Sequence, residues 1–243
     1  HAAQIDVRKS VDDPRYDAQV NIDGLLNLLE NCRRHRVKGV LFASSGGAIY
    51  GETTVLPADE TTPKSPLSPY AVSKLTAENY LYYYYRVHGL PYIALRYSNV
   101  YGPRQNIGGE AGVIAIFTGK MLAGKTATIF GDGEQVRDYV YVEDVARANL
   151  LALGKLENLP LADSIDDRAY NIATGTGTTV NELYARLSEI TGSGGRATFA
   201  AERKGELRKI FLDIRKAGTE ISWKPSVSLS EGLNKTVDYW RNV

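Results

Sequence analysis

Apolar and polar positions follow two different periods along the chain, and these periods predict an alternation of helices and strands. Apolar residues recur at helical spacing over about 13–36 and again from 70 to 85. Short apolar runs, which are typical of buried strands, lie at 38–43, 92–97, 127–130, 139–142 and 169–172. Strands that alternate with helices favour an α/β fold built on a mostly parallel sheet.

Residue types that favour helix ends mark where several helices begin and end. Ser68 can cap a helix whose first turn starts at Pro69, and Gly89 supplies a stop. Two pairs match the S/T-x-x-E capping box and predict further helix starts: Thr179 with Glu182, and Ser228 with Glu231. Helices are also expected over about 113–122 and 143–153.

Composition narrows the class of protein. The chain has 243 residues, of which 43% are hydrophobic, so it can bury a sizeable core. Its net charge of +1 gives no bulk attraction to nucleic acid or an acidic membrane, and no apolar run is long enough to span a bilayer. The single Cys32 excludes an internal disulfide and fits a reducing, cytoplasmic location. His1, His35 and His88 are scattered, so no metal site is expected.

Tyr70 and Lys74 are the first candidates for chemistry. They stand four residues apart in the predicted helix that starts at Pro69, and positions i and i+4 share a helix face. A phenol with a reference pKa of about 10 is a poor base at neutral pH, and a nearby positive charge favours its ionised form. Taken alone, the pair is equally compatible with a surface helix that carries Tyr and Lys by chance.

Five segments, in order across nearly the whole chain, give the pair its context. They are SSGGAIYG (44–51), SPYAVSK (68–74), RYSNVYGPR (96–104), IFGDGEQVRDYVYVED (129–144) and RKGE (203–206). With them the chain resembles the extended short-chain dehydrogenases/reductases, and among these the nucleotide-sugar epimerases of the UDP-glucose 4-epimerase type. The resemblance implies a Rossmann-type doubly wound parallel sheet with a smaller mixed α/β substrate-binding lobe.

The resemblance also implies how the chain is divided. Residues 1–102 would be the remainder of the NAD-binding Rossmann domain, and 103–243 would mainly form the C-terminal lobe, with about 138–190 partly returning to the Rossmann domain. The Gly-rich strand-to-helix turn that holds the NAD pyrophosphate in this family has no counterpart here. We therefore expect roughly 60 to 70 residues, about two βαβ units, upstream of His1, and an inactive fragment without them.

The family mechanism assigns roles to three catalytic residues. Tyr70 would remove the C4 hydroxyl proton of the sugar while hydride passes to NAD, and Lys74 would hold the nicotinamide ribose and lower the pKa of Tyr70. The third hydroxyl falls on Ser45 when counted from the preceding strand, and on Gly46 when counted back from Tyr50. We choose Ser45, because a hydroxyl is needed there; the alternative is that Ser45 only ends a strand and bonds backbone.

The residues after Ser45 discriminate among related reactions. Relatives that dehydrate or decarboxylate the 4-keto intermediate place acidic groups there, whereas this chain has Gly46, Gly47 and Ala48. Elimination would lack its proton carrier, so oxidation and re-reduction at C4 is favoured.

Further contacts are carried over from the family. The residues expected to contact NAD, besides Tyr70 and Lys74, are Ala2, Ala3, Asn21 and Tyr97. Those expected to contact the UDP-sugar are Asn99, Gly112, Val113, Thr128, Ile129, Phe130, Arg137, Arg203, Glu206 and Ile210. Arg137 and Arg203 would grip the pyrophosphate, although Arg137 could instead pair with Asp138.

The expected function is therefore NAD-dependent 4-epimerisation of a UDP-hexose. Ile210 stands where relatives carry either a bulky or a small residue near the sugar, and its intermediate size favours UDP-glucose and UDP-galactose. The alternatives are a UDP-glucuronate or UDP-N-acetylhexosamine 4-epimerase, or an inactive dinucleotide-binding fragment. The resemblance further implies a homodimer formed through the helices at 16–36 and 70–88.

Overall fold

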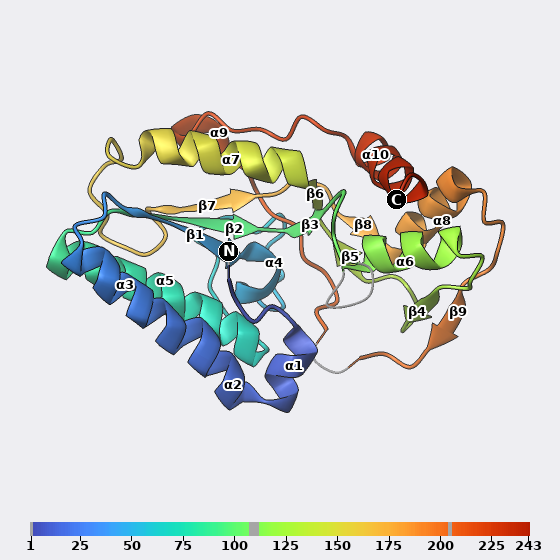
Figure 1. Cartoon of the computed structure of the whole chain (residues 1–243), viewed down its shortest axis with the longest axis horizontal. Coiled ribbons are helices and arrows are strands. Elements are labelled where there is room, and N and C mark those ends of the chain that lie inside the picture. Colours follow the sequence, from blue (N-terminus) through green and yellow to red (C-terminus); the bar gives the residue numbers. More distant parts are fainter. Residues whose placement is uncertain (1, 107–111, 204–205) are drawn as a thin grey trace.

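A three-stranded parallel sheet forms the centre of one half of the molecule (Figure 1). The structure is a computed structural model that describes residues 2–106, 112–203 and 206–243. The sheet has the order β1-β2-β7 and consists of β1 (Val40–Ser45), β2 (Tyr92–Tyr97) and β7 (Ala169–Ile172). Both strand pairs are parallel, which confirms the α/β architecture predicted from the alternation of strands and helices.

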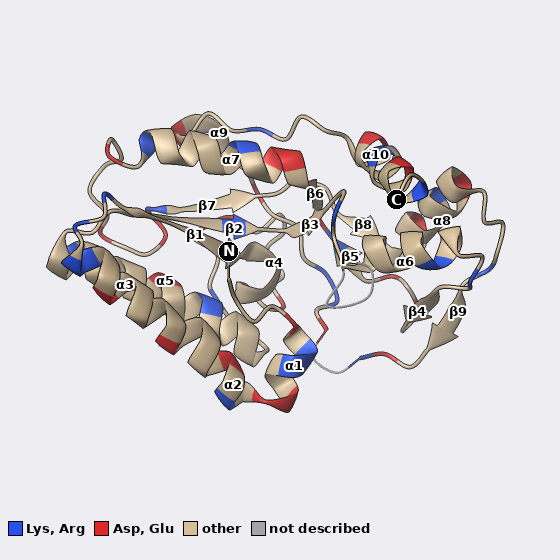
Figure 2. Ribbon diagram, viewed as in Figure 1, with Lys and Arg blue, Asp and Glu red and all other residues tan. Residues whose placement is uncertain are grey.

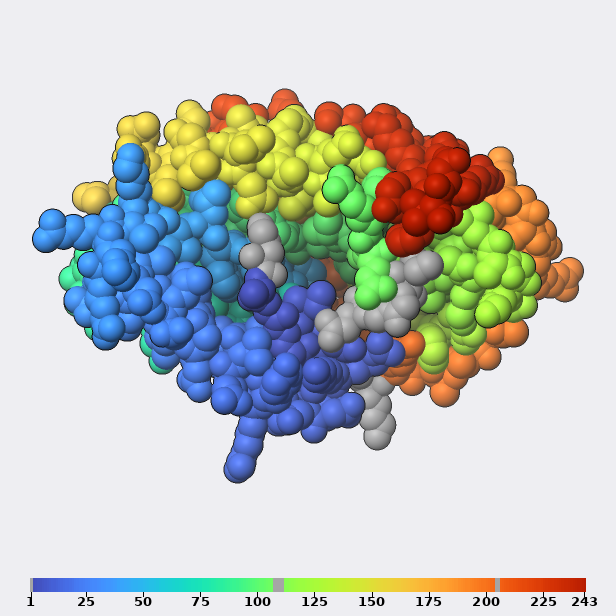
Figure 3. Space-filling model, viewed as in Figure 1, coloured from blue at the N-terminus to red at the C-terminus, as the bar shows by residue number. Residues whose placement is uncertain are grey.

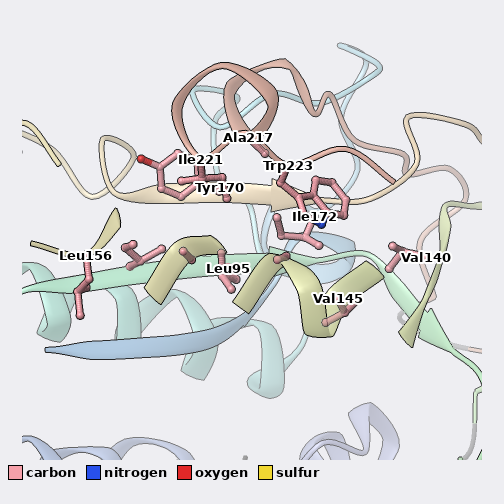
Figure 4. Close-up of a cluster of buried hydrophobic side chains, with 12 residues drawn as sticks. Leu95, Val140, Val145, Leu156, Tyr170, Ile172, Ala217, Ile221 and Trp223 are labelled. Carbon is pink, nitrogen blue, oxygen red and sulfur yellow. The ribbon is translucent and has the colours of Figure 1, made fainter. Parts of the chain in front are cut away.

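Helices cover both faces of this sheet. The helices α3 (Gly24–Arg34) and α5 (Pro69–His88) lie on one face, and α7 (Val142–Lys155) and α9 (Arg215–Glu220) lie on the other (Figure 1). Leu95, Ile172 and Trp223 belong to the buried cluster on the α7 side (Figure 4). The Trp223 indole donates to the Asp144 carbonyl oxygen at 2.8 Å, so the one polar atom of this side chain is satisfied.

The second half of the molecule has its own hydrophobic core. Side chains such as Phe117, Leu187 and Leu233 pack there, and they come from α6 (Val113–Leu122), α8 (Val180–Thr191) and α10 (Leu229–Arg241). Three two-stranded sheets complete this half. They pair β3 (Asn99–Tyr101) with β6 (Tyr139–Tyr141), β4 (Thr128–Phe130) with β9 (Thr198–Ala200), and β5 (Val136–Arg137) with β8 (Thr178–Thr179).

The N-terminal helical region differs from the single helix predicted over 13–36. It consists of α2 (Pro14–Ala18), the π-helix η1 (Gln19–Asp23) and α3, which follow one another without a break. A preceding short helix, α1 (Val7–Asp12), was not predicted. Six residues carry too little periodicity to reveal a helix, and the Asp6 side chain stabilises its start by accepting from two backbone N–H groups.

The strand predicted at 38–43 lies two residues further along the chain. Parallel pairing with β2 runs from Val40 opposite Tyr92 to Ser45 opposite Tyr97, so both serines belong to the strand. The strands at 92–97 and 169–172 and the helix at 113–122 have the predicted bounds. Gly89 ends α5 at φ 66°, a left-handed conformation that glycine adopts without strain.

Residues of both charge types, Lys or Arg and Asp or Glu, are distributed over the helices (Figure 2). Within 2–106, 112–203 and 206–243, no helix is both long enough and apolar enough to cross a membrane.

A fully buried ion pair joins the sheet to α5. The Arg96 guanidinium on β2 contacts the Glu78 carboxylate at 2.6 Å, and neither side chain is exposed. Arg96 also donates to Asp166 at 2.8 Å and to the Tyr50 hydroxyl at 3.1 Å. Glu78 accepts in addition from the Ser44 hydroxyl.

We expect Arg96→Met to lower the free energy of unfolding by about 3 to 5 kcal/mol, because the substitution leaves the Glu78 carboxylate buried without its cation. Urea unfolding at pH 7 measures this loss. The control is Lys235→Ala, which removes one partner of the exposed pair with Glu231 and should change stability little. Equal effects of the two substitutions would contradict the prediction.

Candidate active site

Tyr70 and Lys74 lie on the first two turns of α5, as predicted. The Ser68 side chain caps this helix by accepting from the Ala71 N–H at 3.2 Å, and Pro69 occupies its first turn. The Lys74 Nζ lies 5.7 Å from the centre of the Tyr70 ring. The cap therefore fixes where the helix starts, and helical spacing places the phenol and the ammonium beside each other.

The Lys74 ammonium is buried against β1. Its Nζ donates to the Ala43 carbonyl oxygen at 2.8 Å and lies 4.9 Å from the centre of the Phe42 ring. Burial lowers the pKa of Lys74 to about 8, and the carboxylates of Asp17 and Glu78 oppose this change. Lys74 is consequently still mostly protonated at neutral pH.

The surroundings of the Tyr70 phenol favour its protonated form. Burial raises the pKa of Tyr70 and the Asp17 charge raises it further, whereas the Ser45 hydroxyl acts in the opposite direction. The phenol is therefore protonated at neutral pH in this structure. Ionisation of Tyr70 needs an additional positive charge nearby.

Ser45 stands at the carboxyl end of β1 and at the N-cap position of the short helix α4 (Gly46–Ile49). Its hydroxyl makes no capping bond to α4, so it is available to Tyr70. A Cβ atom at position 46 would lie 2.5 Å from Leu212 Cδ1 and 2.9 Å from the Arg96 carbonyl oxygen. Position 46 has no room for a side chain, and this excludes a catalytic hydroxyl or an added carboxylate there.

Asn21 acts on the chain segment before α1. It is buried in the π-helix η1, and its side chain accepts from the Gln4 N–H at 3.0 Å and donates to the Gln4 carbonyl oxygen at 2.9 Å. The neighbouring Ala2 and Ala3 are exposed. The structure thus places Asn21 as an anchor of the segment that carries these two residues.

Tyr97 follows Arg96 at the end of β2, opposite Ser45 in the strand register. Its hydroxyl pairs with the Asn149 side chain on α7 at 2.8 Å, and its ring packs against the cluster on that side of the sheet. Ser45, Tyr70, Lys74 and Tyr97 therefore gather at the carboxyl ends of β1 and β2, the place where open parallel sheets bind ligands. The surface is hollowed between the blue N-terminal helices and the yellow α7 (Figure 3).

Residues expected to contact the nucleotide lie in the other half of the molecule. The Arg203 guanidinium stacks 3.5 Å from the centre of the Phe130 ring and lies 3.5 Å from the Glu206 carboxylate. Thr128 and Ile129 share strand β4 with Phe130, and Ile129 is buried.

Asn99 begins β3, and its side-chain oxygen lies 3.6 Å from the position that a Cβ of Gly47 would occupy. Gly112 precedes Val113 at the start of α6 without a side-chain cap, which leaves backbone N–H groups available.

Arg137 is half-buried on β5 and donates to the Val136 carbonyl oxygen at 2.9 Å. Asp138 instead accepts from the Thr174 hydroxyl at 2.7 Å and from the Gly175 N–H at 2.9 Å. Among the ion pairs of the described residues there is none between Arg137 and Asp138. The alternative role of Arg137 as the partner of Asp138 therefore has no support.

Ile210 is not brought to the surface of the site. It is 2% exposed and packs with Ile49 and Tyr50, because its backbone N–H bonds to Val136 and holds the segment against this cluster. Two charged residues that the sequence reasoning missed, Asp17 and Glu78, are fully buried, and their charges act on Lys74. Each occupies an ordinary helical position, so no sequence signal marked them.

Comparisons with known proteins show the family to which the chain is similar. A model of the NAD dependent epimerase/dehydratase family matches residues 1–173. The chain is 42% identical over 241 residues to the UDP-glucose 4-epimerase of Mycolicibacterium smegmatis, and the alignment covers 99% of the chain and 74% of that protein.

Two solved structures are similar over the whole chain. The UDP-glucose 4-epimerase of Thermotoga maritima with UDP-glucose has a TM-score of 0.93 and 50% identity, and the match covers 76% of it. The Thermus thermophilus UDP-glucose 4-epimerase complex with NAD has a TM-score of 0.90 and 43% identity, again over 76% of its length. The chain thus spans about three quarters of the relatives it matches.

The low pKa of Lys74 predicts a specific dependence of stability on pH. Its pKa falls from 10.5 to about 8 on folding, so the unfolded chain binds more protons between these values. Stability relative to Lys74→Met should therefore rise by about 2 to 3 kcal/mol between pH 8 and pH 10.5 and stay constant below pH 8. Urea unfolding of both proteins across this range measures the difference, and a difference independent of pH would contradict the prediction.

Proposed function

The chain belongs to the NAD-dependent epimerase/dehydratase family, and we propose that it catalyses NAD-dependent 4-epimerisation of a UDP-hexose, interconverting UDP-glucose and UDP-galactose through a 4-keto intermediate. The observation that carries the proposal is the placement of Tyr70 beside Lys74 on α5, with the Lys74 ammonium bonded to β1 next to the strand end that carries Ser45. A base, a hydroxyl that holds the reacting oxygen and a cation are the groups that this oxidation requires.

The residues present fit a nicotinamide dinucleotide. An ammonium has three N–H donors, and in the described part of the chain Lys74 uses one of them, on Ala43. The remaining donors suit the vicinal hydroxyls of a ribose. Ala2 and Ala3 are exposed and have no bulky side chain to keep a ligand away. When bound, NAD supplies the hydride acceptor and donor that a change of configuration at C4 requires.

Tyr70, Ser45 and Lys74 each have one role in the proposed reaction. The Tyr70 oxygen takes the proton from the sugar C4 hydroxyl, and Ser45 holds the same hydroxyl in place by a hydrogen bond. The Lys74 ammonium binds the ribose and, together with the positive charge that NAD would add when bound, favours the ionised form of Tyr70. No acidic side chain fits at position 46, so no carboxylate there competes with simple return of the hydride.

The other half of the molecule suits the nucleotide part of the substrate. Arg203, which stacks on Phe130, and Arg137 supply guanidinium groups for a pyrophosphate, and Glu206 supplies an acceptor for a ribose hydroxyl. The Gly112 end of α6 offers backbone N–H groups to a phosphate. We assign these residues, with Asn99 and the β4 strand, to binding of the UDP moiety.

Glucose and galactose are the proposed sugars. Ile210 does not decide this, because it is buried. The proposal instead follows the UDP-glucose 4-epimerases that match the chain at 42% to 50% identity. A cytoplasmic location is part of the proposal and is supported by the unpaired Cys32 thiol.

A homodimer formed through α3 and α5 is also part of the proposal. Val72, Tyr83 and Val87 are exposed at spacings that place them on one face of α5, and Leu28 is exposed on the adjacent α3. An apolar face of this kind on two neighbouring helices is suited to pack against a second copy by twofold symmetry.

The central test is Tyr70→Phe. We expect the turnover of UDP-galactose with NAD to fall about a hundredfold or more, because the base is lost while the ring and its packing remain. The matched control is Tyr83→Phe, which removes an exposed hydroxyl from the same helix and should leave turnover unchanged.

UDP-N-acetylgalactosamine and UDP-glucuronate are assayed beside UDP-galactose in the same experiment. A large preference for either compound would replace the proposed sugar while keeping the reaction. Near-normal turnover by Tyr70→Phe would refute the mechanism itself.

Charge on the α3–α5 face should dissociate the dimer. We expect the double variant Leu28→Glu with Val87→Glu to be monomeric, because a dimer would bury two like charges from each subunit. Light scattering coupled to gel filtration measures the mass. Leu161→Glu, which changes an exposed residue outside these helices, should remain dimeric; an unchanged mass of the double variant would place the interface elsewhere.

A further inference from the structure

Asp17 on α2 is a carboxylate with no exposed surface and three hydrogen bonds. One carboxylate oxygen accepts from the Ser73 hydroxyl at 2.6 Å. The other accepts from the Gln4 and Asn21 side-chain amides, each at 3.0 Å. These donors come from three separate segments of the chain, so Asp17 links α5 to the segment before α1 and to the π-helix η1.

The nature of these partners leaves the charge of Asp17 without a direct counterion. All three donors are neutral, and among the ion pairs of residues 2–106, 112–203 and 206–243 none includes Asp17. All three groups donate, as a carboxylate anion requires. A buried carboxylate normally has a cation beside it, because removing the charge from water is costly.

The charge of Asp17 acts on Lys74, which directly follows the Asp17 partner Ser73 in the chain. Two carboxylates act on Lys74, Asp17 from α2 and Glu78 from α5. Glu78 is committed to the Arg96 guanidinium of β2, whereas β1 contributes only the Phe42 ring and the Ala43 carbonyl oxygen. Asp17 therefore supplies negative charge to the site that no cation in direct contact offsets.

We propose that Asp17 is a positioning residue for the Tyr70–Lys74 pair: its buried carboxylate fixes the turn of α5 at Ser73 and supplies the negative charge that keeps the Lys74 ammonium protonated. Ser73 lies between Tyr70 and Lys74 in the chain, so the bond from its hydroxyl to Asp17 restrains the turn that carries both.

The energetic reason is the cost of burying Lys74. Burial alone moves the pKa of Lys74 down toward neutrality, and Asp17 opposes that movement. Without Asp17 a larger fraction of Lys74 would be neutral at pH 7, and a neutral amine would no longer favour the Tyr70 phenolate. Asp17 also raises the pKa of Tyr70, so the same charge that protects Lys74 opposes direct ionisation of Tyr70.

This inference rests on the proposed function, because that function is the reason why Lys74 must stay charged. The test itself uses no substrate. The pKa of Lys74 is measured by titration of lysine ¹³Cε signals in the protein without cofactor, and Lys74→Met identifies the relevant signal. We expect Asp17→Asn to lower the pKa of Lys74 by about one unit, because the amide keeps the shape and removes the charge. The control is Asp12→Asn, which removes an equal charge from an exposed position and should leave the pKa unchanged.

An Asp17→Asn protein that is folded by circular dichroism and has an unchanged Lys74 pKa would overturn the proposal. If Asp17→Asn does not fold, the ¹³Cγ signal of Asp17 in the wild-type protein reports its charge at pH 7: an ionised carboxylate supports the proposal, and a protonated one overturns it. A lowered Lys74 pKa in a protein without epimerase activity would refute the proposed function and leave the charge effect of Asp17 standing.

In the active protein, kcat for UDP-galactose gives a second readout. We expect the basic limb of the pH profile of kcat to shift down by about one pH unit in Asp17→Asn relative to wild type. KM should change less than kcat. A uniform loss of activity at every pH would indicate a purely structural role and would contradict the charge effect.

Discussion

The positions of the candidate catalytic residues depend on the buried contact between Arg96 and Glu78. Arg96 lies opposite Ser44 in the parallel register of β1 and β2, and both side chains reach the Glu78 carboxylate on α5. One carboxylate thus fixes the pairing of two strands and the rotation of the helix above them. Ser45 is the next residue on β1, and Tyr70 and Lys74 lie on the same helix, so their separation is set by this contact.

Hydrogen bonds to distant segments of the chain offset the desolvation of the buried Arg96 guanidinium. The guanidinium donates to the Glu60 carbonyl oxygen at 3.0 Å as well as to Asp166 and the Tyr50 hydroxyl, and Tyr50 in turn donates to Asn171 on β7. A buried ion pair adds little net stability compared with apolar packing, but it tolerates few alternative arrangements. Its effect here is to specify one register and one helix orientation.

Prediction from the sequence succeeded where a local pattern was sufficient. The apolar runs of β2 and β7 and the Ser68 cap of α5 define their elements without reference to the rest of the chain. The bounds of β1 were wrong, because Ser44 and Ser45 read as a loop and remain in the strand only through pairing with β2. The π-helix and α1 were missed because their stability comes from Gln4, Asp6 and Asn21, whose bonds depend on tertiary structure or on one short cap.

In the candidate site, too, the residues within a local motif were predicted and those that depend on tertiary contacts were not. Tyr70, Lys74 and Ser45 were proposed because motifs place them, and the close approach at Gly46 now supplies a steric reason for choosing Ser45. Asp17 has no such signal, since two of its three partners lie 13 and 56 positions away and its helix reads as an ordinary polar one.

Lys74 shows why the two buried carboxylates have different consequences. Glu78 shares its charge with a guanidinium that is itself fully buried, so much of its field at Lys74 is cancelled by a fixed opposite charge. Asp17 is held only by amide and hydroxyl dipoles, which stabilise an anion without neutralising it. The pairing of Glu78 with Arg96 therefore gives rigidity, and the charge of Asp17, unpaired among the described residues, gives a local negative field. A buried ammonium that must keep its proton needs both, because rigidity alone leaves desolvation unopposed.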